Sequence, residues 1–368
     1  MRLFGPHLCT LLAALLLHLN GAAQLDSAKE RPDSSRLSLR LNALAFFDNR
    51  EYSGPIKKGY TLPGFFVEPL LAYGHGRFSM EAGLHVAYLA GADSLRRIVP
   101  MLSLQYRPAA WFAVRLGTLQ HTTHGLPEPL YRPENIYATR PDLGLDLAVR
   151  RPHLRTNLWL NWTRYIDHGS PFQEHFMVGL STRYRPLAAS SVHLPELGVF
   201  AVAAHQGGQI DNSDLPVTTL LNAAISLAYS YRIVSSQRLG AEFVGVAAKD
   251  ASPNPHLPYA QGYGLLAQAT WRTRPTSLAI GYWHAQNLVL TEYGEPLYGS
   301  VSTVDSASNQ PQRQLLRAAF AFHPRLKERG VHLRLSAGLL VDLKRSAAID
   351  YFYALTIGFN GQLWQRKR

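Results

Sequence analysis

The sequence predicts an all-β protein, a transmembrane antiparallel up-and-down β-barrel of about sixteen strands, with fourteen or eighteen as the alternatives. Three observations lead to this prediction. The chain begins with an export signal, later segments alternate apolar and polar residues, and the connections between those segments alternate short and long. A closed barrel crosses an outer membrane with strands that are apolar on one face and with loops that are longer at one end.

Residues 1–23 have the features of a cleaved secretory signal peptide. Arg2 supplies positive charge, residues 11–19 form a short apolar run, and the small residues at 21–23 precede the expected cleavage site. The apolar run is shorter than the ~20 residues that a membrane helix needs, so an uncleaved anchor is the less favoured alternative. The only cysteine, Cys9, lies in this signal, which excludes disulfides and a cysteine nucleophile from the mature chain.

We divide the rest of the chain into a polar periplasmic segment (24–35), the barrel (36–364) and a basic C-terminal tail (365–368). The composition is 46% hydrophobic and 17% charged with a mean hydropathy of −0.10, which is too polar for a helical membrane protein. The net charge of +12 could indicate nucleic acid binding. We expect no nucleic acid partner, because the basic residues cluster at predicted turns and on predicted lumenal faces.

The alternation is clearest in residues 331–344, where one face of the predicted strand carries all the charge and the other carries none. A period of two residues indicates a strand. Strands of soluble β-sandwiches alternate as well, but they average about 5–6 residues, whereas these segments run about 10–14 residues. The predicted membrane face of this strand contains Val331, Leu333, Leu335, Ala337, Leu339, Val341 and Leu343.

The connections indicate the orientation in the membrane. Short turns are expected in the periplasm and long loops outside the cell, so an even strand number places both termini in the periplasm of a Gram-negative outer membrane. The predicted turns are 74–76, 107–109, 151–153, 186–194, 234–237, 274–275 and 324–330. The predicted long loops are 49–60, 121–140, 167–174, 206–216, 250–258 and 290–312.

Several stretches in the first half of the mature chain resemble a known family. They are residues 46–52 (FFDNREY), 128–134, 158–162 (LWLNW) and 171–174 (PFQE). In these stretches the sequence is similar to uncharacterised, porin-like outer-membrane barrels of Bacteroidota-type bacteria. The resemblance implies the outer membrane and the barrel fold, and it implies no reaction.

Strand parity predicts a basic ring in the lumen near the periplasmic ends of the strands. A collar of arginines would attract anionic solutes, because clustered charges in a narrow channel concentrate counter-ions. The structural alternative is that these side chains pair with carboxylates or extend to the rim. The seven predicted members are Arg40, Arg107, Arg150, Arg155, Arg183, Arg232 and Arg272.

The same parity places five carboxylates in the lumen. Counting outward from the turn at 74–76 puts Glu68 and Glu81 opposite each other, where two carboxylates can share a proton, bind a cation or act as an acid and base. The favoured alternative is a ladder of charge pairs that also includes Arg115, Arg155 and Arg334. The predicted lumenal carboxylates are Glu68, Glu81, Asp146, Glu242 and Asp342.

We predict a porin-like channel for small hydrophilic solutes, with a preference for anions, and not an enzyme. The alternatives are a closed accessory barrel in a secretion or surface-assembly complex and a lipid-active barrel enzyme, for which His284 has suitable parity but no matching serine. His121 and His124 form an H-x-x-H spacing that is weak evidence for metal, so no metal and no cofactor are expected.

The expected partners are outer-membrane lipid, lipopolysaccharide, the barrel assembly machinery and the solutes themselves.

Overall fold

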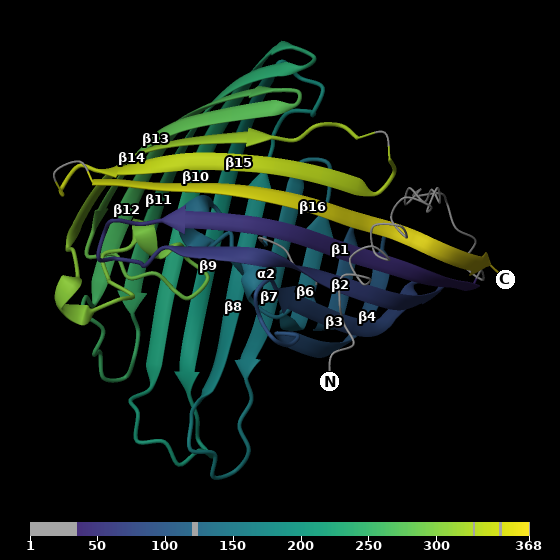
Figure 1. The fold of residues 1–368 in the computed structure, drawn as a ribbon, viewed down its shortest axis with the longest axis horizontal. Coiled ribbons are helices and arrows are strands. Elements are labelled where there is room, and N and C mark those ends of the chain that lie inside the picture. The colour runs from purple at the N-terminus through teal and green to yellow at the C-terminus, as the bar shows by residue number, and fades with distance from the viewer. Residues whose placement is uncertain (1–34, 120–123, 327, 346–347, 368) are drawn as a thin grey trace.

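The structure is a single closed barrel. A computed structural model describes residues 35–119, 124–326, 328–345 and 348–367, so the predicted signal peptide, Cys9 and His121 lie outside the described residues. Each strand pairs antiparallel with its neighbours in sequence, and β1 closes the ring against β16 (Figure 1). The prediction of a sixteen-stranded up-and-down barrel is confirmed.

The strands are longer than those of most soluble sheets, and several exceed the length that the membrane requires. They are β1 (Ser35–Glu51), β2 (Tyr60–His75), β3 (Phe78–Leu89), β4 (Arg97–Ala109), β5 (Phe112–Thr118), β6 (Leu143–Arg150), β7 (Leu154–Arg164), β8 (Glu174–Tyr184), β9 (His193–Gly207), β10 (Thr218–Val234), β11 (Gln237–Asp250), β12 (Gln261–Thr273), β13 (Thr276–Gln286), β14 (Gln312–Phe322), β15 (Val331–Asp342) and β16 (Ala348–Lys367).

The two ends of the barrel differ as the sequence predicts. One end, called the short-turn end, has connections such as 151–153 and 274–275, and the other, called the long-loop end, carries the loops 119–142 and 287–311. The prediction of a C-terminal tail from residue 365 is wrong for most of that segment. Strand β16 continues to Lys367 because its last residues pair with the start of β1, where Gln365 lies opposite Ser38.

The outer face of the barrel is a continuous apolar surface. Leu227 and Phe243, for example, are 60% and 61% exposed although they are large and apolar. An exposed apolar face of this extent is typical of a surface in contact with hydrocarbon, so it suits a bilayer. No helix in the described part of the chain is both long and apolar enough to cross a membrane.

Two loops fold into the barrel at the long-loop end. We call residues 124–142 and 287–311 the inner plug. The first part contains η1 (Glu128–Leu130) and α2 (Asn135–Ala138), and the second contains η2 (Pro296–Tyr298) and η3 (Ser306–Ser308). Helix α2 lies on the inner side of β1 (Figure 1), where the rings of Tyr137 and Phe46 stack with centroids 4.6 Å apart.

The plug packs on an apolar inner wall, which the sequence did not predict. Trp159, Phe200 and Trp283 are almost fully buried on the inner faces of β7, β9 and β13, and Leu288 and Leu297 of the plug lie in the same cluster. The interior of the long-loop half therefore resembles the core of a soluble protein rather than a water-filled channel.

Candidate functional site

Backbone groups of the plug are bound by side chains of the barrel wall. Asn222 on β10 donates to the carbonyl oxygen of Val289 at 2.8 Å, and its own Oδ1 accepts from the amide of Thr291 at 2.8 Å. The indole of Trp283 on β13 donates to the carbonyl oxygen of Tyr298 at 3.0 Å. These bonds satisfy loop groups that are buried away from water, so the plug is part of the folded structure.

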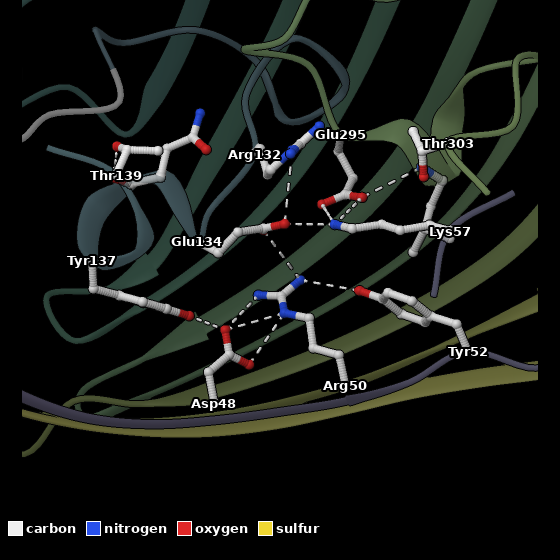
Figure 2. A network of polar contacts seen from close by, with 12 residues as sticks. Asp48, Arg50, Tyr52, Lys57, Arg132, Glu134, Tyr137, Thr139, Glu295 and Thr303 are labelled. Carbon is white, nitrogen blue, oxygen red and sulfur yellow. Dashed lines mark hydrogen bonds and ion pairs between the residues drawn. The ribbon is translucent and has the colours of Figure 1, made fainter. Parts of the chain in front are cut away.

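A buried network of ions joins the plug to β1 (Figure 2). Lys57, in the loop between β1 and β2, lies 2.6 Å from Oε1 of Glu134 and 3.0 Å from Oε1 of Glu295. Arg50 on β1 lies 4.0 Å from Glu134 and 3.1 Å from Asp48. Lys57 therefore bridges both parts of the plug, and its removal would leave two carboxylates buried without their main cation.

The two carboxylates bound by Lys57 differ in their pKa values. Burial raises the pKa of Glu134, but Lys57 and Arg50 outweigh burial and lower it. Burial raises the pKa of Glu295, and the negative charge of Glu134 adds to that effect. The network therefore favours an ionised Glu134 next to Lys57, and it makes an ionised Glu295 the less stable of the two carboxylates.

Two further charge pairs lie where the plug meets β14 and β15, and Arg313 of β14 also donates to the carbonyl oxygen of Leu297 in the plug at 3.1 Å. Arg313 lies 2.6 Å from Asp342, and both side chains are buried. Arg317 lies 2.7 Å from Glu128 of the plug, whose other oxygen accepts from the Tyr298 hydroxyl at 2.6 Å. Asp342, predicted to face the lumen, is thus placed at the edge of the plug.

A cavity of about 420 Å³ opens at the long-loop end and is called the outer pocket. It is lined by three arginines, Arg97, Arg132 and Arg140, together with Thr163 and Glu292. Three guanidinium groups around one pocket attract anions such as phosphate, which arginine binds through two parallel hydrogen bonds.

A hydroxyl, an imidazole and a carboxylate follow one another at the rim of the outer pocket. Thr163 Oγ1 on β7 lies 2.8 Å from His175 Nδ1 on β8, and His175 Nε2 lies 3.8 Å from Glu292 Oε1 of the plug. The Thr163 hydroxyl also lies 2.9 Å from the carbonyl oxygen of His175, so it has two acceptors within reach. We call Thr163, His175 and Glu292 the rim triad.

The rim triad depends on an irregular strand pair. The register between β7 and β8 shifts between Trp162 and Arg164, which leaves Thr163 as an extra residue against His175. Bulges of this kind redirect a side chain. The sequence carries no local signal for this juxtaposition, because it depends on a bulge and on a loop more than a hundred residues away.

His124 lies under the outer pocket and holds Asp142. His124 Nε2 lies 2.9 Å from Asp142 Oδ2, which also accepts from the hydroxyl of Tyr293 at 2.5 Å. The imidazole stacks on Trp159 at 4.3 Å, and Trp159 fits because Gly179 has no side chain: a Cβ there would lie 2.0 Å from the indole. With both ring nitrogens bonded, to Asp142 and to Asn157, His124 supports the floor of the pocket.

The lumen contains two further cavities, of about 960 and 640 Å³. Six of the seven arginines expected in a lumenal ring line them: Arg40 lines the larger cavity, Arg107, Arg150, Arg155 and Arg183 line the smaller cavity, and Arg272 lines both. The seventh, Arg232, donates to the carbonyl oxygens of Ser190 and Ala189 in the turn between β8 and β9. Arg238 also lines the smaller cavity, and it is not among the predicted residues.

The predicted pairing of Glu68 with Glu81 is wrong. The turn between β2 and β3 is at Gly76 and Arg77 rather than at residues 74–76, and Gly76 adopts a positive φ of 56°. That change moves the partner of Glu68 by four residues, from Glu81 to His85, whose Nδ1 lies 2.8 Å from Glu68 Oε1. Glu81 instead lies opposite Ala72 and forms an ion pair with Arg40.

The other two predicted lumenal carboxylates are bound by neutral amides. Asp146 accepts from the side chain of Asn157, and Glu242 accepts from Gln268 at 2.7 Å. Asp146 also lies opposite Arg115 in the register of β5 and β6. His284 faces outward on β13, 6.0 Å from the ring of Tyr263, and its cross-strand neighbours are Leu265 and Gln314.

Comparison with known protein families shows to which family the chain belongs. The sequence model of the Lipid A 3'-O-deacylase-type family matches residues 26–367. The chain belongs to this family. No curated protein matches. Membership of the Lipid A 3'-O-deacylase-type family agrees with the barrel fold and places the protein in the outer membrane.

Solved structures of outer-membrane barrels share the fold. OpdL of Pseudomonas aeruginosa is 13% identical with a TM-score of 0.53, covering 89% of this chain and 99% of that chain. The outer-membrane protein OpdK of the same organism is 10% identical with a TM-score of 0.53, covering 90% and 99%. OmpT of Vibrio cholerae without loop L8 is 9% identical with a TM-score of 0.51, covering 88% and 99%. The predicted resemblance to porin-like outer-membrane barrels is confirmed.

The family also corrects one prediction. The sequence interpretation excludes an enzyme because no serine lies near His284 on the membrane face. That exclusion is wrong, since the Lipid A 3'-O-deacylase-type family is named for an ester hydrolase. The interpretation considered one outward histidine and overlooked the inward rim triad, whose members come together only in the folded barrel.

Proposed function

We propose that this outer-membrane barrel is a hydrolase that removes an ester-linked acyl chain from a phosphorylated glycolipid of the lipid A class. The observation that carries the proposal is the rim triad beside three arginines in one pocket. Membership of the Lipid A 3'-O-deacylase-type family supports the same substrate class. We further propose that the long-loop end faces the cell exterior, where lipopolysaccharide lies, and that both termini are periplasmic.

In the proposed reaction the Thr163 hydroxyl attacks the carbonyl carbon of the acyl ester. His175 accepts the hydroxyl proton at Nδ1, and Glu292 stabilises the imidazolium from the Nε2 side. The proton then passes to the departing sugar oxygen, which leaves an acyl-threonine ester. Water, deprotonated by the same imidazole, attacks that ester, releases the fatty acid and restores the Thr163 hydroxyl.

Arg140 is the group best placed to stabilise the oxyanion of this reaction. Its guanidinium donates to the carbonyl oxygens of Trp162 and Thr163, which fixes it beside the attacking hydroxyl. Its other N–H groups and those of Arg97 and Arg132 line the same pocket, where they would bind the developing oxyanion and the phosphates of the glycolipid.

The test measures loss of an acyl chain from lipid A by mass spectrometry, with the purified barrel in detergent micelles. We expect H175A and T163A each to lower the rate about 10²–10⁴-fold. The matched control is H205A. His205 Nδ1 lies 2.9 Å from Thr219 Oγ1 in a similar pair on β9 and β10, but neither residue lines the outer pocket. An unmodified protein without activity, or an H175A variant as active as H205A, would overturn the proposal.

We propose passage of small hydrophilic solutes as a second function of the same barrel. The supporting observation is the pair of cavities in the lumen, of about 960 and 640 Å³, which are both lined in part by arginines and carboxylates. Reconstitution in a planar bilayer should give stepwise conductance. Silence at high protein loading would contradict solute passage and would favour a closed barrel that serves as an accessory part of a surface-assembly complex.

A further inference from the structure

Arginines face one another directly across strands at the short-turn end. Arg150 on β6 is opposite Arg155 on β7, and Arg155 is opposite Arg183 on β8. A second row is built the same way, because Arg232 on β10 is opposite Arg238 on β11, which is opposite Arg272 on β12. Like charges directly opposite each other destabilise a sheet, so these rows are not explained by stability.

The charges in these rows are only partly neutralised by the protein. Glu196 on β9, between the rows, forms ion pairs with Arg183 and with the neighbouring Arg185. Four other arginines of the rows are Arg150, Arg155, Arg238 and Arg272. Among the residues that the structure describes, no carboxylate lies within ion-pair distance of their guanidinium groups, nor of the guanidinium group of Arg107 on β4.

Both rows border the cavity of about 640 Å³ near the short-turn end. Its lining contains an excess of five positive charges, from eight arginines and three carboxylates. The arginines are Arg107, Arg115, Arg150, Arg155, Arg183, Arg185, Arg238 and Arg272, and the carboxylates are Asp146, Glu196 and Glu242. Two of these carboxylates already accept hydrogen bonds from Asn157 and Gln268.

We propose that this cavity binds a compact multivalent oxyanion, such as a polyphosphate or a tricarboxylate, that enters from the short-turn end. Neighbouring strands hold the Cβ atoms of opposite residues about 5 Å apart, so one anion with several oxyanion groups could contact several arginines at once. Carboxylate and phosphate both match the paired N–H donors of arginine. This site rests on the proposed passage of solutes, because it lies in the same lumen, but it predicts equilibrium binding of an anion rather than conductance.

Calorimetric titration of the purified barrel with tripolyphosphate, citrate and chloride tests the site. We expect saturable binding of tripolyphosphate and citrate, no saturable binding of chloride, and weaker binding as salt concentration rises. The R155Q/R238Q variant should lose about tenfold in affinity for each arginine removed. The control, R77Q/R274Q, removes the same charge from exposed turns at the same end and should change affinity less than about twofold.

Equal losses in both variants, or no saturable binding to the unmodified protein, would overturn the inference. Displacement of bound tripolyphosphate by lipid A micelles would identify a lipid headgroup as the anion, and displacement by citrate alone would identify a soluble one. Conductance of the same preparations separates this inference from the function on which it rests. Binding without conductance would support the anion site and contradict solute passage. Conductance without binding would support solute passage and contradict the anion site.

Discussion

The two halves of the lumen treat charge in opposite ways. In the long-loop half, Lys57 is enclosed by Glu134 and Glu295, and Arg313 by Asp342, within an apolar core formed by the plug. In the short-turn half, arginines such as Arg155 and Arg238 stand opposite other arginines around a polar cavity. The first arrangement resembles the interior of a folded protein, and the second resembles a binding site for a ligand that is not part of the chain.

This difference shows that strand parity alone does not reveal what a lumenal charge does. Arg313 and Arg155 have the same inward parity on their strands, yet Arg313 is bound to Asp342 and Arg155 is not bound to a described carboxylate. The distinction follows from the surroundings of the two residues. Arg313 lies in the half that the plug fills, where it pairs with Asp342 of β15 and donates to the carbonyl oxygen of Leu297. Among the described residues, the plug contacts the arginine rows through the carbonyl oxygen of Gly125, which accepts from Arg183, and it supplies no carboxylate to them.

Replacement of Lys57 in the long-loop half should cause the largest loss of stability. K57M leaves Glu134 and Glu295 buried without their shared cation, so we expect a loss of about 3–5 kcal/mol in the free energy of unfolding. Hydrogen exchange of residues 287–311 should rise together with that loss. K58M is the matched control, because the adjacent Lys58 is exposed, and a similar loss there would show that Lys57 does not hold the plug.

Truncation of an apolar side chain of the plug should cause the next largest loss of stability. L288A removes a fully buried side chain between the plug and the wall, so we expect a loss of about 2–5 kcal/mol by thermal or denaturant unfolding in detergent. The control is L227A, whose side chain is 60% exposed on the membrane face. A larger loss for L227A than for L288A would contradict an apolar core inside the barrel.

Removal of one arginine from the rows of the short-turn half should raise the stability slightly. R155Q removes a charge that faces arginines on both sides, so we expect stability to rise by about 0.2–1 kcal/mol at low salt and the gain to shrink at high salt. R77Q, in an exposed turn, should leave the melting temperature unchanged. A fall in stability for R155Q would mean that Arg155 has a structural role.

The strands were predictable because each carries its own evidence. Alternation over ten or more residues identifies a strand without reference to the rest of the chain, and the turns at 151–153 and 274–275 contain prolines that mark them. The hairpin between β2 and β3 shows the limit. A turn displaced by one to two residues leaves both strands and their parity intact, but it separates Glu68 from Glu81 by changing the register.

The candidate site was less predictable because it combines distant elements. His175 and Thr163 meet through a bulge between β7 and β8, and Glu292 reaches them from a loop that precedes β14. Residues 158–162 and 171–174, next to Thr163 and His175, resemble a known family, but that resemblance implies no reaction and does not show that the two residues meet. The search for an outward serine beside His284 could not succeed, because the candidate residues face inward.

The sequence by itself determined the barrel, the apolar outer face and the inward parity of the arginines, since these depend on a two-residue period within each strand, and it gave the strand number to within two. Only the tertiary structure decided that two loops fill the long-loop half and which arginines acquire carboxylate partners there. It also decided the rim triad. Those features depend on where long loops pack and on register between strands, and neither is encoded in the period of any single segment.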